Sequence, residues 1–228
     1  MGAAMIQHHT DMLQGSEAWL AARCGLLTAS EMKLILTPTL KGASNDKSRS
    51  HFYELMAQRI TRHVEPHYIS DDMLRGMEDE GDARKLYAGR YAPVAECGFI
   101  TNDEWGFTLG YSPDGLVGDD GLIEIKSRRQ KFQVETILSD DVPDEYMMQI
   151  QTGLLVTGRA WCDFISYSGG LPMVTIRVPV LPAYRDAILE AADAFETRMV
   201  EAMADYALTL NSPRLIPTER KIIEDMHA

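Results

Sequence analysis

Residues 110–126 limit the fold more tightly than any other stretch of the sequence. A Pro-Asp-Gly turn containing Asp114 follows one apolar segment, and Gly-Asp-Asp-Gly at residues 118–121 separates the next two. Short apolar segments divided by such turn residues predict a β-hairpin. Successive strand side chains point to opposite faces, so Glu124 and Lys126 share one face while the isoleucines beside Glu124 point into the core. Two carboxylates and an ammonium group are therefore expected to converge from rigid elements.

This expected cluster suits phosphodiester hydrolysis. Carboxylate oxygens with room for water are the ligands that Mg²⁺ prefers. One or two such ions can generate hydroxide and stabilise the charge that develops on the leaving oxygen. Lys126 can orient or deprotonate the attacking water. On this segment alone a second interpretation stays open, because Pro-Asp-Gly is a common turn and Glu124-x-Lys126 can form an ion pair on the solvated face of a structural hairpin.

The arrangement of Asp114, Glu124 and Lys126 matches the signature of the PD-(D/E)xK nuclease superfamily. Three further blocks narrow the match, namely residues 14–31 (QGSEAWLAARCGLLTASE), 76–87 (GMEDEGDARKLY) and 146–157 (YMMQIQTGLLVT). In this order, and over roughly residues 14–167, the blocks resemble the lambda-exonuclease-like (YqaJ-type) viral recombinases.

The resemblance implies a 5′→3′ exonuclease that acts on double-stranded DNA. Such an enzyme releases mononucleotides and leaves a 3′ single strand for a partner annealing protein. The resemblance also implies a homotrimeric ring around the duplex. It implies magnesium as the cofactor, with two ions per active site, and Mn²⁺ as a substitute. Finally, it implies a phage or prophage origin, with action in the cytoplasm of the bacterial host.

The resemblance further implies a role for each residue of the catalytic segment. Asp114 and Glu124 would bind metal together with the Ile125 backbone carbonyl, and Lys126 would lie beside the nucleophilic water. Glu80, in the second block, would be an accessory carboxylate near the second metal. For Glu80 the alternative is a solvated helix residue.

The resemblance implies that Arg23 and Ser30 bind the terminal 5′ phosphate of the DNA, and the chemistry of both residues is compatible with this role. Arginine grips phosphate through a fork of donors, and Ser30 would lie in the first turn of a helix that begins at Thr28, where amides favour anions. The alternative is that Arg23 caps its own helix and Ser30 only fills the turn. Gln149 and Gln151 in the last block lie two residues apart and so do not share one face of a helix. Only one of them is therefore expected at the site, and Gln151 is the preferred one.

The charge of the chain bears on a DNA substrate. The formal net charge is −12 and the pI about 4.9, which argues against an extended DNA-binding surface. The charge is uneven, however. Residues 20–67 hold seven basic and four acidic side chains, whereas residues 96–145 hold four basic and twelve acidic ones. An acidic exterior around a basic inner channel would reconcile these values with DNA binding.

The sequence also weighs against competing functions. The three cysteines form no CxxC pair, which favours a reducing compartment such as the cytoplasm. Three cysteines cannot supply the four ligands of the common iron–sulfur cluster of RecB-like nucleases. A glycoside hydrolase would need paired carboxylates without the lysine. Another PD-(D/E)xK endonuclease and a catalytically inactive DNA-binding module remain as alternatives.

The chain length predicts one domain over residues 1–228, which the resemblance implies is a nuclease domain, with a flexible arm at 1–14 and a C-terminal extension at 209–228. Helices are expected at residues 16–23, from 28, and at 48–63, 72–90, 134–138, 144–156 and 182–208. Strands are expected at residues 94–101, 106–112, 116–117, 122–126, 160–167 and 173–180. This order is typical of an α/β domain with a mixed central sheet flanked by helices, and the resemblance implies a restriction-endonuclease-like PD-(D/E)xK core.

Overall fold

The computed structural model describes residues 5–66 and 70–220, with the side chains of residues 71–73 excepted. The strands form two four-stranded sheets. In spatial order the first holds β1 (Ile6–His9), β3 (Phe99–Asn102), β4 (Leu109–Tyr111) and β2 (Leu27–Thr28). The second holds β5 (Gly115–Val117), β6 (Gly121–Ser127), β7 (Trp161–Tyr167) and β8 (Val174–Pro179).

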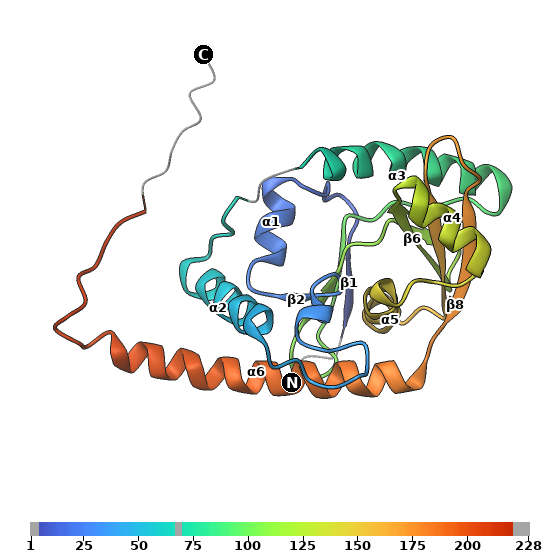
Figure 1. The fold of residues 1–228 in the computed structure, drawn as a ribbon. Coiled ribbons are helices and arrows are strands. Elements are labelled where there is room, and N and C mark those ends of the chain that lie inside the picture. The colour runs from blue at the N-terminus through green and yellow to red at the C-terminus, as the bar shows by residue number, and fades with distance from the viewer. Residues whose placement is uncertain (1–4, 67–69, 221–228) are drawn as a thin grey trace, which may run out of the picture.

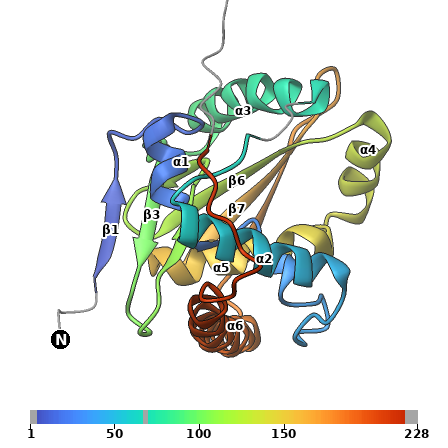
Figure 2. The ribbon, with the colours of Figure 1, turned by 90° about the vertical axis from the view of Figure 1, so that its left-hand side faces the viewer.

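Helices cover both sides of these sheets (Figures 1 and 2). They are α1 (Glu17–Arg23), the 3₁₀ helix η1 (Met32–Leu34), α2 (Asp46–Thr61), α3 (Asp71–Arg90), α4 (Gln130–Ser139), α5 (Asp144–Thr157) and α6 (Pro182–Thr209). Figure 1 shows α3 along one side of the molecule and the long α6 along the opposite side. No helix in the described part of the chain combines the length and apolarity that a membrane span requires.

Local signals explain where several helices begin and end. The Ser16 hydroxyl accepts the Trp19 N–H at the start of α1, and the Asn45 side chain accepts the Ser48 N–H at the start of α2. Such caps satisfy amides that have no partner within the helix. Helix α5 ends at Gly158, whose φ of 66° is the left-handed conformation that glycine adopts without strain.

Strand β6 is buried on both faces. On one face Ile123 and Ile125 pack against α3, where Ala83 and Tyr87 are also buried. On the other face Leu122 belongs to the core that α5 completes. The predicted alternation along this strand is therefore confirmed. The face that carries Glu124 and Lys126 lies toward α5 instead of toward solvent.

Helix α5 is the central packing element. It contacts β3 and β4 of the first sheet, β7 of the second, η1 and α6. Because it touches both sheets, α5 can present a polar side chain at the junction where β4 ends and β5 begins. That junction contains Asp114.

The predicted α/β class is confirmed, and both sheets are mixed. Strand β2 pairs parallel with β4, and β6 pairs parallel with β7, while the other pairs are antiparallel. The strands form two sheets instead of one continuous sheet. The break between β4 and β5 falls at Pro113, which has no N–H to donate to a strand ladder.

The expectation of a loose arm at residues 1–14 is wrong for its described part. Strand β1 pairs antiparallel with β3, with Ile6 opposite Asn102 and His9 opposite Phe99. Further along the arm, the Met12 carbonyl passes so close to Gly98 that a Cβ there would lie 1.7 Å from the oxygen. The arm is held by the free edge of β3, a partner about 90 residues away that no local pattern predicts. Residues 1–4 lie outside the described residues.

The helix expected from Thr28 is also wrong. Thr28 ends β2, and between Thr28 and Pro38 only the three residues of η1 are helical. The Thr28 hydroxyl donates to the Glu31 carboxylate at 2.6 Å, so these two side chains bond each other and do not form a capping box. Ser30 therefore lies in the turn after β2 and not in the first turn of a helix. Of the C-terminal extension, residues 210–220 are described and contain no helix.

Candidate functional site

Asp114, Glu124 and Lys126 converge as the hairpin predicts. The Lys126 Nζ lies 2.6 Å from the Glu124 Oε1, and the Ile125 N–H donates to the Asp114 Oδ2 at 2.6 Å. Asp114, the residue before β5, thus contacts the backbone of β6 at Ile125. Glu124 is fully buried and the Lys126 side chain is 24% exposed. This burial rules out an ion pair on a solvated face.

Glu80 faces the same cluster from α3. Arg84, one turn further along, pairs with the Glu80 carboxylate and donates through its Nε to the Asp114 carbonyl at 2.8 Å. Burial raises the pKa of Glu80, the Arg84 charge opposes this, and the Glu124 charge adds to it. The charges of Glu80 and Glu124 therefore interact, and the Glu80 side chain is only 29% exposed. Glu80 is not a solvated helix residue.

The three carboxylates repel one another. Burial, and then the charges of Glu124 and Glu80, hold the pKa of Asp114 well above its usual value, although Lys126 and the Ile125 N–H oppose this. Burial lowers the pKa of Lys126, but the charges of Glu124 and Asp114 raise it by more, so its net shift is upward. The Lys126 side chain is consequently an ammonium at neutral pH.

This donor set suits a hard cation. Asp114 and Glu124 supply carboxylate oxygens, and Mg²⁺ is commonly held by one or two carboxylates with water at its other positions. A cation between them would also offset the repulsion that raises the pKa of Asp114. Within the described residues, no group of three or more His, Cys, Asp or Glu side chains is arranged to hold a metal ion. The fit therefore rests on the two carboxylates, with the Ile125 carbonyl as the expected third ligand.

The structure places Gln149, not Gln151, at the carboxylates. The Gln149 amide donates to the Glu124 Oε1 at 2.5 Å. Gln151 is buried on another side of α5, where its amide donates to the Pro179 carbonyl at 2.8 Å and accepts the Leu181 N–H at 2.8 Å. Its side chain ties α5 to the end of β8, so the preference for Gln151 is corrected. The two glutamines do lie on different faces, as their spacing predicts.

Arg23 contacts the segment that precedes Asp114. Its guanidinium donates to the Thr28 hydroxyl at 3.1 Å and to the Ser112 hydroxyl at 3.5 Å. It also lies 4.4 Å from the centre of the Trp19 ring, and the Trp19 indole N–H donates to Ser112 at 2.9 Å. These contacts direct Arg23 away from the carbonyls at the end of α1, so it does not cap its own helix.

A pocket of about 180 Å³ joins the two groups of predicted residues. Its lining includes Arg23 and Ser30, and it also includes Asp114 and Gln149. Residues separated by more than 80 positions in sequence thus share one polar cavity. The sequence reasoning did not assign the other polar residues of this pocket, which are Gln14, Trp19, Tyr111 and Ser112. All four lie within or next to the blocks that carry the family resemblance, which is the signal that could have found them.

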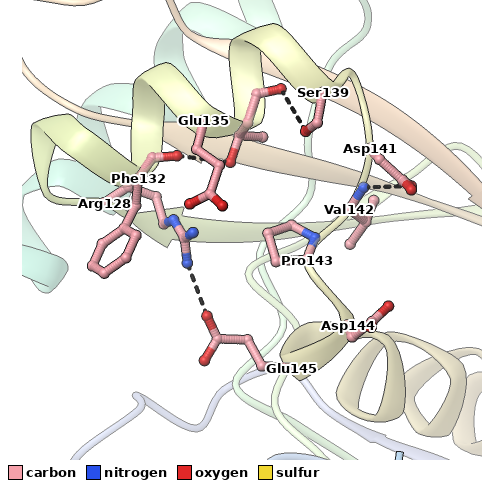
Figure 3. Close-up of a pocket in the computed structure, with 10 residues that line it drawn as sticks. Arg128, Phe132, Glu135, Ser139, Asp141, Val142, Pro143, Asp144 and Glu145 are labelled. Carbon is pink, nitrogen blue, oxygen red and sulfur yellow. Dashed lines mark hydrogen bonds and ion pairs between the residues drawn. The ribbon is translucent and has the colours of Figure 1, made fainter.

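A second pocket, of about 470 Å³, lies between α4 and the loop that leads to α5 (Figure 3). Arg128 lines it and points toward Glu145, with a distance of 3.0 Å between their charged groups. None of the predicted site residues lines this pocket. Arg128, which follows the catalytic strand, is buried and paired and does not extend toward solvent.

With this geometry in place, comparison with known proteins identifies the family. Residues 18–160 match the YqaJ-like viral recombinase domain. The chain belongs to this family. This match confirms the family that the sequence motifs predict. No curated protein matches the sequence at a significant level.

Solved structures agree with this family and fold. An alkaline exonuclease (LHK-Exo) from Laribacter hongkongensis is 34% identical, with a TM-score of 0.77 over 86% of this chain and 98% of that chain. A structure of LHK-Exo in complex with dAMP matches equally well. A phage-related exonuclease from Haemophilus somnus 129PT is 13% identical, with a TM-score of 0.60 over 79% of this chain and 96% of that chain, and this similarity shows the fold alone.

The repulsion among the carboxylates predicts a pH-dependent gain in stability for Asp114→Asn. The folded protein holds the pKa of Asp114 above its unfolded value, so ionised Asp114 destabilises the fold. The penalty is absent below the unfolded pKa of about 3.9, grows as the pH rises from there to the folded pKa, and stays constant above it. Without metal, Asp114→Asn is expected to unfold several degrees above the native protein at pH 8, with a smaller difference at pH 4.

Thermal unfolding in a chelator at both pH values checks this expectation. Asp119→Asn is the matched control, because Asp119 is exposed in the turn before β6 and its replacement should change the midpoint little. An Asp114→Asn protein that is less stable than the native one at pH 8 would contradict the account.

Proposed function

We propose that the protein is a magnesium-dependent 5′→3′ exonuclease that acts on double-stranded DNA. It releases mononucleotides and leaves a 3′ single-stranded overhang. The observation that carries the proposal is the pocket shared by Arg23, Ser30, Asp114 and Gln149. This pocket sets an arginine that can bind phosphate beside Asp114, which is one of the clustered carboxylates. The alkaline exonuclease that is 34% identical supports the activity, and its complex with dAMP is consistent with a mononucleotide product.

Asp114 and Glu124 would hold the magnesium ion, together with the Ile125 carbonyl. Glu80 would serve a second ion as an accessory carboxylate, and Mn²⁺ has the same preference for oxygen ligands. When bound, these ions supply Lewis-acid activation of water and stabilise charge on the leaving oxygen. The carboxylates themselves are fixed by the fold, since the Ile125 N–H holds Asp114 and Gln149 holds Glu124.

Lys126 acts as a fixed positive charge. Its raised pKa keeps it protonated in the structure described here. Held 2.6 Å from Glu124, the ammonium can donate a hydrogen bond to the attacking water and offset negative charge on the phosphate in the transition state. This position favours orientation of the water over its deprotonation by Lys126.

Arg23 and Ser30 would bind the 5′ phosphate at the end of the DNA strand. Arg23 is held in place by Thr28, Ser112 and Trp19, so little side-chain freedom is lost when a phosphate binds. A cavity of about 180 Å³ has room for a terminal phosphate. An end anchored there would place the next phosphodiester near Asp114, so digestion would begin at the 5′ end.

The remaining parts of the proposal rest on the family. A homotrimeric ring around the duplex would place the acidic surface outside and a basic channel inside, which is consistent with the net charge of −12. A monomeric mass in sedimentation at micromolar concentration would contradict the ring. The single strand would pass to an annealing protein in the cytoplasm of a bacterial host, and the family points to a phage or prophage source. The complete, convergent carboxylate site argues against an inactive DNA-binding module.

Replacing Lys126 with alanine should abolish digestion while leaving DNA binding intact. Loss of a donor aimed at developing charge typically costs about 10²- to 10³-fold in rate, and we expect at least this loss on linear duplex DNA. Lys85→Ala is the matched control, because the Lys85 side chain is 82% exposed on α3. Near-normal digestion by Lys126→Ala would contradict the catalytic role.

The end-binding pocket predicts faster digestion of duplexes that carry a 5′ phosphate than of those with a 5′ hydroxyl. Charge-assisted bonds to a phosphate contribute about 1.5–3 kcal/mol each, so we expect a difference of about tenfold or more. Arg23→Ala should remove most of this difference. Arg49→Ala, whose side chain is 67% exposed on α2, should preserve it. Equal rates of the native protein on both duplexes would rule out the phosphate pocket.

A further inference from the structure

A buried tyrosine completes the set of donors around Glu124. The Tyr111 hydroxyl donates to the Glu124 Oε2 at 2.8 Å. The other oxygen, Oε1, takes the Gln149 amide and the Lys126 ammonium. Both oxygens of this carboxylate are therefore engaged, from three different elements of the fold. Tyr111 is 1% exposed and Glu124 is fully buried, so solvent does not replace the tyrosine bond.

The fold holds Tyr111 in a fixed position. It is the last residue of β4, three positions before Asp114, and it belongs to the central core. Helix α5 approaches its ring at Gly153, where an added Cβ would lie only 2.8 Å from the ring Cζ. A glycine at this point of α5 thus makes room for the ring.

We propose that Tyr111 is a positioning residue that fixes the carboxylate of Glu124 for metal binding. The inference rests on the proposed metal-dependent function and assigns to it a residue outside the expected ligand set. Mg²⁺ demands near-ideal octahedral geometry, so a carboxylate that can rotate binds it less well than one held in a single orientation. Groups that bond to a ligand from behind typically contribute about 10- to 100-fold to metal affinity or activity.

The chain contains a matched control for this bond. Tyr87 is also 1% exposed, and its hydroxyl donates to the buried Asp163 carboxylate at 2.6 Å. This pair belongs to the core under α3, on the opposite face of the second sheet. Asp163 is further bound by Arg177 at 2.8 Å. Tyr87→Phe therefore removes the same kind of buried bond without removing any hydrogen bond to Asp114, Glu124 or Glu80.

The test compares Tyr111→Phe, Tyr87→Phe and the native protein in three measurements. Calorimetric titration with Mn²⁺ in the absence of DNA gives the metal affinity. Digestion of linear duplex over a range of Mg²⁺ concentrations gives the half-saturating concentration and the maximal rate. Thermal unfolding in a chelator gives the stability of each protein.

Tyr111→Phe is expected to bind Mn²⁺ about 10- to 100-fold more weakly. It should need a correspondingly higher Mg²⁺ concentration for half-maximal digestion and recover much of its rate at high Mg²⁺. Tyr87→Phe should unfold at a lower temperature but keep the native metal affinity. Gly153→Ala, which pushes on the ring while the hydroxyl remains, should weaken Mn²⁺ binding in the same direction.

Two results would overturn the inference. One is a Tyr111→Phe protein with native Mn²⁺ affinity and native Mg²⁺ dependence. The other is an equal loss of affinity in Tyr87→Phe, which would assign the effect to general destabilisation. A native protein that neither binds Mn²⁺ nor digests DNA would instead overturn the proposed function, and this inference with it, so the two failures are distinguishable.

Discussion

The buried carboxylate of Glu124 is the constraint around which the rest of the molecule is organised. An ionised carboxylate removed from water is strongly unfavourable unless each oxygen is paired. Here Lys126 comes from the same strand, Gln149 from α5 and Tyr111 from β4. One side chain thus fixes how the two sheets and the central helix meet. The alternation along β6 places Lys126 beside Glu124, and α5 brings Gln149. The break at Pro113 lies between Tyr111 and Asp114.

The same arrangement carries a cost in stability that a function would explain. Asp114 and Glu80 are placed where the Glu124 charge repels them, and a fold selected for stability alone would separate or neutralise these groups. Natural proteins accept such conflicts at functional sites. A bound cation would relieve this repulsion, so the charge pattern and the proposed chemistry would have one physical cause. The pocket that adds Arg23 and Ser30 would then direct the proposed chemistry to a strand end.

Much of this organisation could be predicted from the sequence, because local patterns determine it. The alternation along β6 placed Glu124 and Lys126 together, and apolar periodicity gave α3, α5 and α6 to within a residue or two. The expectations that failed depend on partners that are distant in the sequence. The arm pairs with β3, Thr28 pairs with Gly110 in β4, and Gln149 instead of Gln151 contacts Glu124. The motifs gave the family, and the position of Ser112 beside Arg23 required the fold.

We propose that the site formed by Asp114, Glu124 and Lys126 digests DNA from a 5′ end. The most direct measurement incubates the protein in Mg²⁺ with linear duplex DNA labelled at the 5′ or the 3′ end, and with covalently closed circular duplex. The account predicts early release of the 5′ label as a mononucleotide, late release of the 3′ label, and an intact circle. Nicking or linearisation of the circle, or early release of the 3′ label, would contradict it.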